Sequence, residues 1–223
     1  DMAMALLLAA ARRIAEIDRW VRAGGWDHDL ATMHLVGREV HESSLGIVGL
    51  GQIGTEVARR ARGFDMKVLY SDVVRNEEAE RSIEAEYVDQ DRLLRESDFV
   101  TLHTVLTEAT YHLIGEAELD MMKPTAVLVN AARGPVVDPK ALYRALKEGH
   151  IWAAALDVTE PEPVPTDDPL LTLDNCLIVP HIASASYATR REMSGLSAQN
   201  LVNGLKGERL VTCVNPAVYE RKG

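Results

Sequence analysis

Three kinds of chemically capable side chain follow three successive apolar runs in the second half of the sequence. Arg133 stands in NAARGPVVD after one run, Asp157, Glu160 and Glu162 stand in LDVTEPEP after the next, and His181 stands in VPHIASAS after a third. A guanidinium is not buried without a partner, and a plain strand-to-helix turn does not need an arginine. We therefore expect an anion to bind at Arg133.

These residue types suit hydride transfer to a 2-oxo acid, whose carboxylate lies beside its carbonyl. Arg133 can bind the carboxylate and polarise the carbonyl with its planar, permanently charged fork. His181 can protonate the developing alkoxide, and in the reverse direction it can accept the proton of the alcohol. A carboxylate hydrogen-bonded to the imidazole would orient it and favour its protonated form, and Glu162 is the candidate for that partner.

Each of these residues also has an ordinary structural explanation. A single loop arginine is usually a surface charge, a histidine after a proline is more often structural than catalytic, and glutamates in a Pro-rich acidic loop usually face solvent. The joint placement of Arg133, Glu162 and His181 after successive strands nevertheless favours catalysis. Ligands of open α/β sheets bind outside the carboxyl ends of the strands, where all three would stand.

A glycine-rich turn in the first half of the sequence supplies a candidate site for the hydride donor. Residues 49–54 read GLGQIG, a G-x-G-x-x-G that follows one predicted strand and opens a predicted helix. Gly49 permits the tight turn, Gly51 lets the backbone approach a pyrophosphate, and Gly54 packs the helix against the strand. The helix N-terminus adds free N–H groups and a partial positive charge. A glycine-rich turn without a ligand is the alternative.

The residues after the second predicted strand favour NAD over NADP as the cofactor. Asp72 ends that strand, where an acid accepts hydrogen bonds from the adenosine ribose hydroxyls and repels a 2′-phosphate. Arg75 stands three residues after Asp72 and could bind a 2′-phosphate, so NADP is the alternative cofactor.

Short apolar runs and amphipathic segments alternate from residue 44 onward, and they would position these residues. The runs are apolar on both faces, as expected of strands that are covered on both sides. Strand–helix–strand repetition predicts an α/β fold with a doubly wound parallel sheet and right-handed crossovers, flanked by N- and C-terminal helices. The predicted strands are Leu45–Gly49, Lys67–Ser71, Phe99–His103, Ala126–Asn130, Ala153–Leu156 and Leu177–Val179. The predicted helices are Ile53–Arg62, Asn76–Ala85, Asp91–Glu96, Glu116–Met122, Pro139–Glu148 and Ala188–Leu205.

The first residues, DMAMALLLAAARR, predict a helix rather than a targeting signal or a membrane span. The apolar run of about ten residues is shorter than the ~20 needed to cross a bilayer. Its flanking charges, Asp1 before it and Arg12 and Arg13 after it, are opposite in order to those of a secretory signal. We expect one helix, capped by Asp1, that runs to about Arg22 and stops at the glycine pair that follows.

The composition fits an ordinary soluble globular protein. The chain has 223 residues, of which 47% are hydrophobic and 26% charged, and a net charge of −10 that argues against binding to nucleic acid. Two cysteines, Cys176 and Cys213, are too few and too far apart for a disulfide framework or a metal site. We therefore expect no metal, no membrane and a reducing, cytoplasmic environment.

Taken together, GLGQIG, Asp72, DFVTLHTVLT, NAARGPVVD, ALDVTEPEP and PHIASAS resemble the D-isomer-specific 2-hydroxyacid dehydrogenases. The likeness covers nearly the whole chain and is greatest to the branch of glyoxylate/hydroxypyruvate reductases and 3-phosphoglycerate dehydrogenases. The resemblance implies NAD-dependent interconversion of a small 2-oxo acid and its D-2-hydroxy acid. An NAD-sensing corepressor of the same fold, or another NAD enzyme such as a formate dehydrogenase, is the alternative.

The resemblance also assigns roles to individual residues. It implies that Arg133, Glu162 and His181 are the catalytic residues, with His181 as general acid/base, and it gives Glu160 no catalytic role. It implies that Asp157 contacts the nicotinamide carboxamide. The other cofactor-binding residues that it implies are Gly49, Gly51, Gln52, Ile53, Gly54, Asp72, Ala132 and Ala183.

Two positions depart from the family pattern near the expected nicotinamide. Val105 stands where a proline often follows the strand-end histidine and its neighbour, which changes the loop against the nicotinamide ribose. Ala183 stands where glycine is common, which is a mild steric difference.

The family pattern further implies three parts for this chain. Residues 1–36 would form a crossing helix and a dimerisation arm, residues 37–186 the dinucleotide-binding domain, and residues 187–223 a C-terminal helix and tail that pack on a substrate domain. Most of that N-terminal substrate domain has no counterpart in this sequence. We therefore expect the chain to bind NAD and to turn over little substrate by itself.

The end of the crossing helix and the arm after it are the expected homodimer contact. Candidate contact residues within positions 20–37 are Trp20, Trp26, Met33 and Leu35. A loop this rich in large apolar residues is unusual on a monomer. Packing of these side chains on their own domain is the alternative.

Overall fold

Parallel strands form one sheet in the structure, a computed structural model that describes residues 1–26 and 35–220. The seven strands of this described part lie in the order β3-β2-β1-β4-β5-β6-β7, and all neighbours are parallel. The doubly wound parallel sheet expected from the sequence is confirmed. The strands are β1 (Ser44–Val48), β2 (Lys67–Ser71), β3 (Glu86–Tyr87), β4 (Phe99–Leu102), β5 (Val127–Asn130), β6 (Ala153–Leu156) and β7 (Cys176–Ile178).

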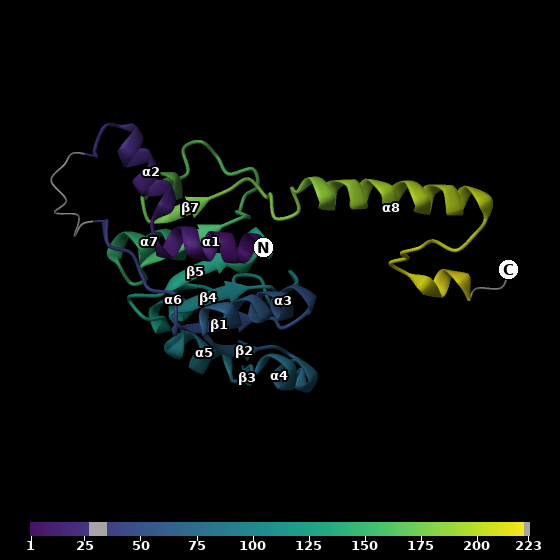
Figure 1. Ribbon diagram of the computed structural model, residues 1–223, viewed down its shortest axis with the longest axis horizontal. Coiled ribbons are helices and arrows are strands. Elements are labelled where there is room, and N and C mark those ends of the chain that lie inside the picture. Colours follow the sequence, from purple (N-terminus) through teal and green to yellow (C-terminus); the bar gives the residue numbers. More distant parts are fainter. Residues whose placement is uncertain (27–34, 221–223) are drawn as a thin grey trace. The chain divides into compact units, whose positions relative to one another are not determined.

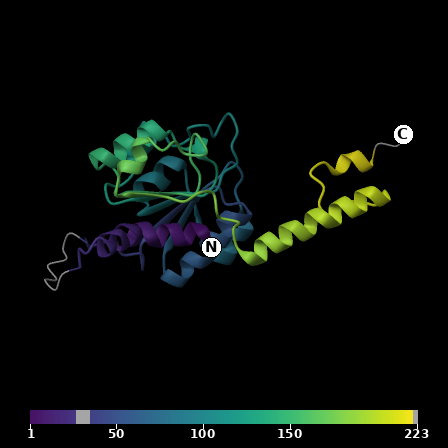
Figure 2. The ribbon, with the colours of Figure 1, turned by 90° about the horizontal axis from the view of Figure 1, so that it is seen from above.

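Helices cover both faces of this sheet (Figure 1, Figure 2). One core cluster contains side chains of α1 (Met2–Ala11), α3 (Gln52–Ala61) and α4 (Glu77–Ile83). A second cluster, on the other face, contains side chains of α5 (Gln90–Glu96), α6 (Glu116–Met121) and α7 (Pro139–Glu148). Further described helices are α2 (Ile14–Arg22) and α8 (Tyr187–Lys206), and short 3₁₀ turns span Arg62–Phe64, Gly134–Val136, Pro169–Thr172 and Pro216–Tyr219.

Successive residues of the central strands point into opposite clusters, which explains why the strand sequences are apolar throughout. In β5, Val127 and Val129 join the cluster that contains α1, whereas Leu128 joins the cluster that contains α7. All three side chains are fully buried. Burial of a side chain of this size stabilises a fold by about 1.5–3 kcal/mol. The two-sided core therefore holds the strand ends, and the candidate residues that follow them, in a fixed register.

The opening helix is not continuous, so that expectation was wrong. α1 and α2 are separated at Arg13, which adopts the left-handed conformation with φ +54° and donates from Nε to Glu16 at 2.8 Å. α1 is apolar and largely buried, whereas α2 has no buried residue. The break thus falls where the buried surface ends, and no glycine or proline marks it. Asp1 occupies the N-cap position of α1, but its carboxylate pairs with Arg60 instead of capping the helix.

The other predicted elements are present, with boundaries that differ by no more than two residues. The strand β3 was not expected, because two residues are too few to give a periodic signal. Helix α7 matches the prediction, and Asp138 caps it by accepting hydrogen bonds from the backbone N–H groups of Lys140 and Ala141 at 2.8 and 3.2 Å.

Two compact units divide the chain, Asp1–Ala183 and Ser184–Gly223. The first unit contains the sheet and the helices that cover it. The second contains α8, which Ser186 caps through its hydroxyl and which ends at Gly207 in the left-handed conformation, φ +72°. No residue of α8 is buried within this unit.

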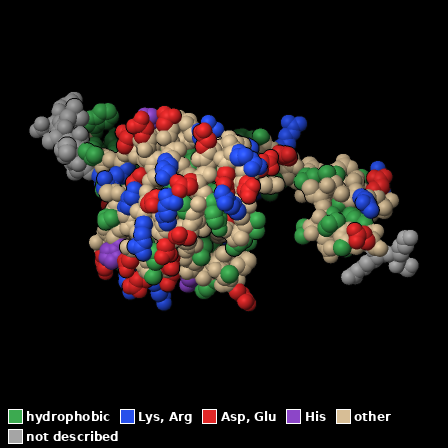
Figure 3. Space-filling view, turned by 90° about the horizontal axis from the view of Figure 1, so that it is seen from below, with side chains coloured by type: hydrophobic (Ala, Val, Ile, Leu, Met, Phe, Trp, Pro, Cys, Tyr) green, Lys and Arg blue, Asp and Glu red, His purple; other side chains and the backbone are tan. Residues whose placement is uncertain are grey.

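No helix in the described residues is both long and apolar enough to cross a membrane. Figure 3 shows one face of the molecule, on which Lys and Arg side chains are interspersed with Asp and Glu side chains. Interspersed charges of opposite sign compensate one another, so this face carries no broad field of a single sign.

Candidate active site

The sheet reverses its strand order at β1, whose two neighbours are β2 and β4. In doubly wound sheets, ligands bind at this switch point, outside the carboxyl ends of the strands. The glycine turn (residues 49–54) follows β1, and His103 follows β4, so both lie at this edge. The strands that precede Arg133, Asp157 and His181 end at the same edge because the sheet is parallel.

Close packing requires two of the glycines in the turn. Gly49 has φ +95°, and a Cβ there would lie 2.9 Å from the carbonyl carbon and oxygen of His103. A Cβ on Gly54 would lie 2.2 Å from the carbonyl oxygen of Gly49, so α3 could not approach β1 as it does. These are the turn and packing roles expected of the two residues. A Cβ on Gly51 would meet nothing within 4 Å, so a ligand can approach the backbone there.

Helix α3 presents an open N-terminus beside the turn. Gly51 occupies the N-cap position and offers no side chain to the first N–H groups of the helix. Gln52 and Ile53 begin the helix, and both are exposed. First-turn N–H groups have no acceptor within a helix, and the helix dipole adds a partial positive charge. The turn and helix together therefore fit a pyrophosphate group.

Asp72 lies at the carboxyl end of β2, next to this turn. One of its carboxylate oxygens accepts a hydrogen bond from the Leu50 N–H at 2.7 Å, and the residue stays partly exposed, so it can accept further bonds. Arg75 donates from Nε and Nη2 to the Glu80 carboxylate at 2.7 and 2.8 Å. These bonds lower the pKa of Glu80 to about 2. Arg75 is therefore held by an internal carboxylate.

His103 and Thr104 follow β4 and carry buried polar atoms without a partner. Within the described part of the chain, Nδ1 of His103 and Oγ1 of Thr104 make no hydrogen bond. Burial lowers the pKa of His103 to about 4, so its imidazole is neutral at pH 7. Unpaired polar atoms beside Gly49 fit a ligand that supplies hydrogen bonds at this edge. Neither residue was expected in the site, although a polar pair directly after a buried strand is the signal that points to them.

Asn130 shapes the loop that carries Arg133. Its side chain is buried, its Oδ1 accepts a hydrogen bond from the Ala132 N–H at 3.0 Å, and its Nδ2 donates to the Arg133 carbonyl at 3.0 Å. The Arg133 guanidinium is exposed and donates to the Ala132 carbonyl at 2.6 Å. It pairs with no carboxylate among the residues that the structure describes. An exposed guanidinium without a counter-ion fits the expected anion, whose binding stays a prediction.

Asp157 is 1% exposed and fixes the loop that carries His181. Its Oδ1 and Oδ2 accept hydrogen bonds from the N–H groups of Ile182 and Ala183 at 2.7 and 3.0 Å, and its carbonyl accepts the His181 N–H at 2.8 Å. A buried carboxylate needs donors of this kind. The expected contact with the nicotinamide carboxamide would use the remaining lone pairs.

Glu162 and His181 form the pair that the sequence suggested. Nδ1 of His181 lies 2.6 Å from Oε1 of Glu162. An ionised carboxylate only accepts hydrogen bonds, so the proton lies on Nδ1 and the opposite nitrogen, Nε2, is available to a substrate. His181 also has φ +52°, a conformation uncommon outside constrained sites. A pocket of about 440 Å³ adjoins the pair and is lined by Asp157, Thr159, Glu162, Pro163, Val164, Leu171, Ile178, Val179, Pro180 and His181.

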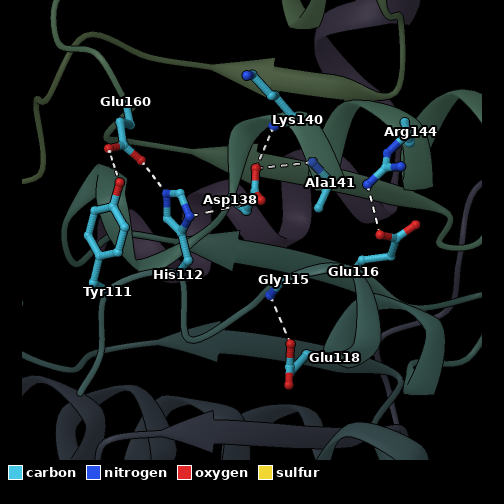
Figure 4. Close-up of polar contacts among 10 residues, drawn as sticks. All are labelled: Tyr111, His112, Gly115, Glu116, Glu118, Asp138, Lys140, Ala141, Arg144 and Glu160. Atoms are coloured by element: carbon cyan, nitrogen blue, oxygen red, sulfur yellow. Dashed lines mark hydrogen bonds and ion pairs between the residues drawn. The ribbon is translucent and has the colours of Figure 1, made fainter. Parts of the chain in front are cut away.

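Glu160 points to a different group of residues (Figure 4). Its Oε2 lies 2.7 Å from Nε2 of His112, and its Oε1 accepts a hydrogen bond from the Tyr111 hydroxyl at 3.2 Å. The two glutamates of this loop therefore pair with different histidines. A glutamate in a Pro-rich acidic loop would ordinarily face solvent, whereas Glu160 is paired with other side chains.

A doubly wound sheet with an open helix N-terminus at its switch point defines a dinucleotide-binding α/β domain. Residues 4–183 match the family model described as D-isomer specific 2-hydroxyacid dehydrogenase, NAD binding domain. The chain belongs to this family.

Comparison with individual proteins gives the same result. The chain is 54% identical to a glyoxylate reductase of Korarchaeum cryptofilum, covering 99% of this chain and 66% of that protein. It is 48% identical to a glyoxylate/hydroxypyruvate reductase B of Enterobacter sp. (strain 638), covering 98% and 67%. Among solved structures, a D-lactate dehydrogenase with NAD⁺ from Lactobacillus jensenii has a TM-score of 0.83 at 32% identity, covering 96% and 67%. The chain thus spans about two thirds of the length of these relatives.

Proposed function

We propose that the chain is the cofactor-binding and acid–base portion of an NAD(H)-dependent oxidoreductase that interconverts a small 2-oxo acid and its D-2-hydroxy acid. The observation that carries this proposal is the 2.6 Å hydrogen bond between Glu162 and His181 at the cofactor edge of the sheet. Other histidines of the chain also pair with carboxylates, as His150 does with Asp120, so the position of this pair after the strands of the cofactor edge matters as much as its length. A general acid at this edge has to be both oriented and protonated. Membership of the family supports the same chemistry.

The residues present at the edge fit a dinucleotide. The open N-terminus of α3 would hold its pyrophosphate, Asp72 its adenosine ribose, and the loops after β5, β6 and β7 its nicotinamide. When bound, the cofactor supplies or accepts a hydride. The residues that we propose to contact it are Gly49, Gly51, Gln52, Ile53, Gly54, Asp72, Ala132, Asp157 and Ala183.

The reduction needs a hydride at the carbonyl carbon and a proton at the carbonyl oxygen. Arg133 would bind the substrate carboxylate and polarise the neighbouring carbonyl. As the hydride reaches the carbon, the π electron pair moves to the oxygen, and His181 gives that oxygen the proton from Nε2. Glu162 stabilises the imidazolium before the transfer and holds the Nδ1 proton throughout. The products are the 2-hydroxy acid and the oxidised cofactor.

The residues proposed to face the adenosine ribose favour NAD as the cofactor. The partly exposed carboxylate of Asp72 would accept hydrogen bonds from ribose hydroxyls and would repel a 2′-phosphate. The cation that could bind such a phosphate, Arg75, is held by both oxygens of Glu80. Both observations support NAD(H) over NADP(H).

Glyoxylate and hydroxypyruvate are the first substrates to test. Relatives at 54% and 48% identity carry the names glyoxylate reductase and glyoxylate/hydroxypyruvate reductase B. Each substrate is a small 2-oxo acid that can present its carboxylate to Arg133. Phosphohydroxypyruvate is the third candidate, and it adds a phosphate to the same 2-oxo acid core.

The test is to titrate the purified chain with NADH and then to add each 2-oxo acid while following NADH absorbance. Binding and turnover are separate readouts, because the chain spans about two thirds of its relatives' length. We expect His181→Ala to leave NADH binding intact and to lower any turnover by about 10²–10⁴-fold, the usual contribution of a general acid. His150→Ala is the matched control, since His150 is an exposed histidine that pairs with Asp120.

The possible outcomes distinguish the parts of the proposal. NADH binding together with turnover that depends on His181 supports the whole proposal. NADH binding without turnover by the unsubstituted chain supports the cofactor site and refutes catalysis by this chain alone. Failure to bind NADH contradicts the assignment of the glycine turn.

We also infer that residues 20–37 contribute to a homodimer contact. Trp26 is 67% exposed, which supports a contact outside its own domain, whereas the indole of Trp20 lies against Gly25 of the same chain. Met33 lies outside the described residues. Light scattering is the test: a dimer that Trp26→Ala weakens supports the inference, and a monomeric unsubstituted chain refutes it.

A further inference from the structure

A group of side chains outside the proposed catalytic residues joins three loops of the fold (Figure 4). His112 has φ +49° and stacks on Tyr111, with ring centroids 4.0 Å apart and an interplanar angle of 17°. Its Nε2 lies 2.7 Å from one oxygen of Glu160, and the Tyr111 hydroxyl donates to the other oxygen at 3.2 Å. Both oxygens of the Glu160 carboxylate are therefore held by residues that stand 48 and 49 positions earlier in the chain.

The same histidine also contacts the loop that follows Arg133. Its backbone N–H donates to the Pro135 carbonyl at 2.8 Å, and its Nδ1 lies 3.9 Å from Oδ2 of Asp138. The other carboxylate oxygen of Asp138 caps α7, so the contact point is anchored to a helix. His112 thus lies between the loop that carries Arg133 and the loop that carries Glu162.

The two loops touch each other directly as well. A Cβ on Gly134 would lie 1.9 Å from the Thr159 carbonyl oxygen, so the two backbones are in van der Waals contact. The Thr159 hydroxyl donates to the Pro161 carbonyl at 2.8 Å and folds the second loop on itself. Because the two backbones are in contact, we expect a displacement of one loop to move the other.

Glu160 and Glu162 are two residues apart, and each is paired with its own histidine. The Glu160 side chain is 27% exposed and that of Glu162 is 41% exposed. Without His112, Glu160 would be a partly buried carboxylate that has lost a charge-assisted partner, which is unfavourable. The loop would then turn to bring Glu160 to solvent or to another donor, and Glu162 would move with it.

We propose that His112 is a positioning residue for the acid–base pair. By binding Glu160, His112 keeps Glu162 within hydrogen-bond distance of Nδ1 of His181. By contacting the loop that carries Arg133, it also maintains the position of the Glu162–His181 pair relative to Arg133. The effect on catalysis rests on the function proposed above, whereas the effect on the Glu162–His181 hydrogen bond does not.

The test reads the state of the His181 ring directly, in the 223-residue chain without substrate. Long-range ¹H–¹⁵N spectra of ¹⁵N-histidine report which ring nitrogen carries the proton, and Glu162→Gln supplies the reference for a ring without its carboxylate. We expect His112→Leu to shift the His181 signals toward those of Glu162→Gln at the same pH. We expect His112→Gln to leave them near the unsubstituted values, because its amide still donates to Glu160.

The leucine and glutamine variants share the same left-handed backbone position, so their comparison isolates the side-chain donor. Arg144→Gln is the control for a nearby ion pair, since it breaks only the surface contact with Glu116 (Figure 4). His181 signals that are unchanged in a folded His112→Leu variant overturn the proposal. Should that variant not fold, Glu160→Leu removes the hydrogen bond from its other side, with the same expected and refuting results.

Kinetics separate this proposal from the proposed function. In a chain that turns over, His112→Leu should lower kcat by about tenfold to a hundredfold, as a displaced reacting group does, and should leave the KM for NADH unchanged. If the unsubstituted chain neither binds NADH nor turns over a 2-oxo acid, the proposed function fails while the spectroscopic result still decides the role of His112. If kcat is unchanged in His112→Leu while turnover is robust, the positioning role fails and the proposed function stands.

Discussion

Replacing Asp157 with asparagine tests how far the candidate site depends on one buried carboxylate. Asp157 is 1% exposed, and its two oxygens accept hydrogen bonds from the N–H groups of Ile182 and Ala183 at 2.7 and 3.0 Å. Asparagine has nearly the same shape but only one accepting oxygen. One of the two N–H groups would therefore keep its partner, and the other would face an NH₂ group that also donates.

The size of the effect follows from these contacts. A hydrogen bond to a charged group contributes about 1.5–3 kcal/mol net, and a buried N–H left without an acceptor costs about 1–3 kcal/mol. We therefore expect Asp157→Asn to lower the free energy of unfolding by roughly 2–5 kcal/mol. That is a large share of the ~5–15 kcal/mol that is typical of a folded domain. Because the same carboxylate holds the segment after His181, the affinity for NADH should fall as well.

Urea unfolding of the variant, followed by circular dichroism, measures the first effect. The matched control is Asp174→Asn, whose side chain is 77% exposed and pairs with Arg19 at 3.2 Å. An exposed pair of this kind contributes at most about 1 kcal/mol, so this variant should unfold almost like the parent chain. If Asp157→Asn and Asp174→Asn unfold with the same free energy, the reasoning about the buried carboxylate is refuted.

Three further predictions concern side chains around the sheet. His103 should contribute a loss of about 3 kcal/mol in the free energy of unfolding as the pH is lowered from about 6.5 to 4. The unfolded chain protonates this imidazole across that range, whereas the folded chain, in which burial lowers the His103 pKa to about 4, does so only near its lower end. Urea unfolding at several pH values should show this loss, and His103→Gln should reduce the pH dependence by the same amount. Glu80→Gln should weaken the hydrogen bonds that keep Arg75 away from a 2′-phosphate, and so raise the affinity for NADPH relative to NADH in a fluorescence titration. An unchanged ratio of the two affinities would contradict the idea that Glu80 keeps Arg75 from the phosphate. Desolvation raises the pKa of the partly buried Cys176 thiol to about 12, so a thiol reagent at pH 8 should label it slowly in the folded chain and rapidly in urea, whereas equal rates would contradict the raised pKa.

The sheet could be predicted from the sequence because each central strand is buried on both faces. A residue such as Leu128 has apolar neighbours on either side in the chain, and those neighbours serve the opposite core cluster. This requirement leaves uninterrupted apolar runs, which mark the strands. The strand β3 has two residues and leaves no such run. The break at Arg13 depends on where buried surface ends in space, and the local sequence, which favours helix throughout, does not carry that information.

The candidate site could be predicted where a residue directly follows a strand, because parallel strands bring their carboxyl ends together. Glu162 and His181 were expected to meet for this reason, and they lie 2.6 Å apart. The partner of Glu160 could not be predicted, since His112 lies 48 positions away in a loop without a strand to place it. The internal role of Asp157 was also not foreseen, because the donors to its carboxylate are backbone N–H groups, which every residue type except proline provides.

The strand that leads to His181 is the outermost on its side of the sheet. Among the strands that the structure describes, β7 pairs only with β6, and its three residues are each only partly buried. Edge elements with little burial open by local fluctuation at a lower free energy than the central strands do. Amide hydrogens of β7 should therefore exchange with solvent before those of β4 and β5, and gentle heating should release the histidine while the centre of the sheet is still folded. If the proposed catalysis depends on His181, its upper temperature limit would be set by fraying of this edge and not by melting of the domain.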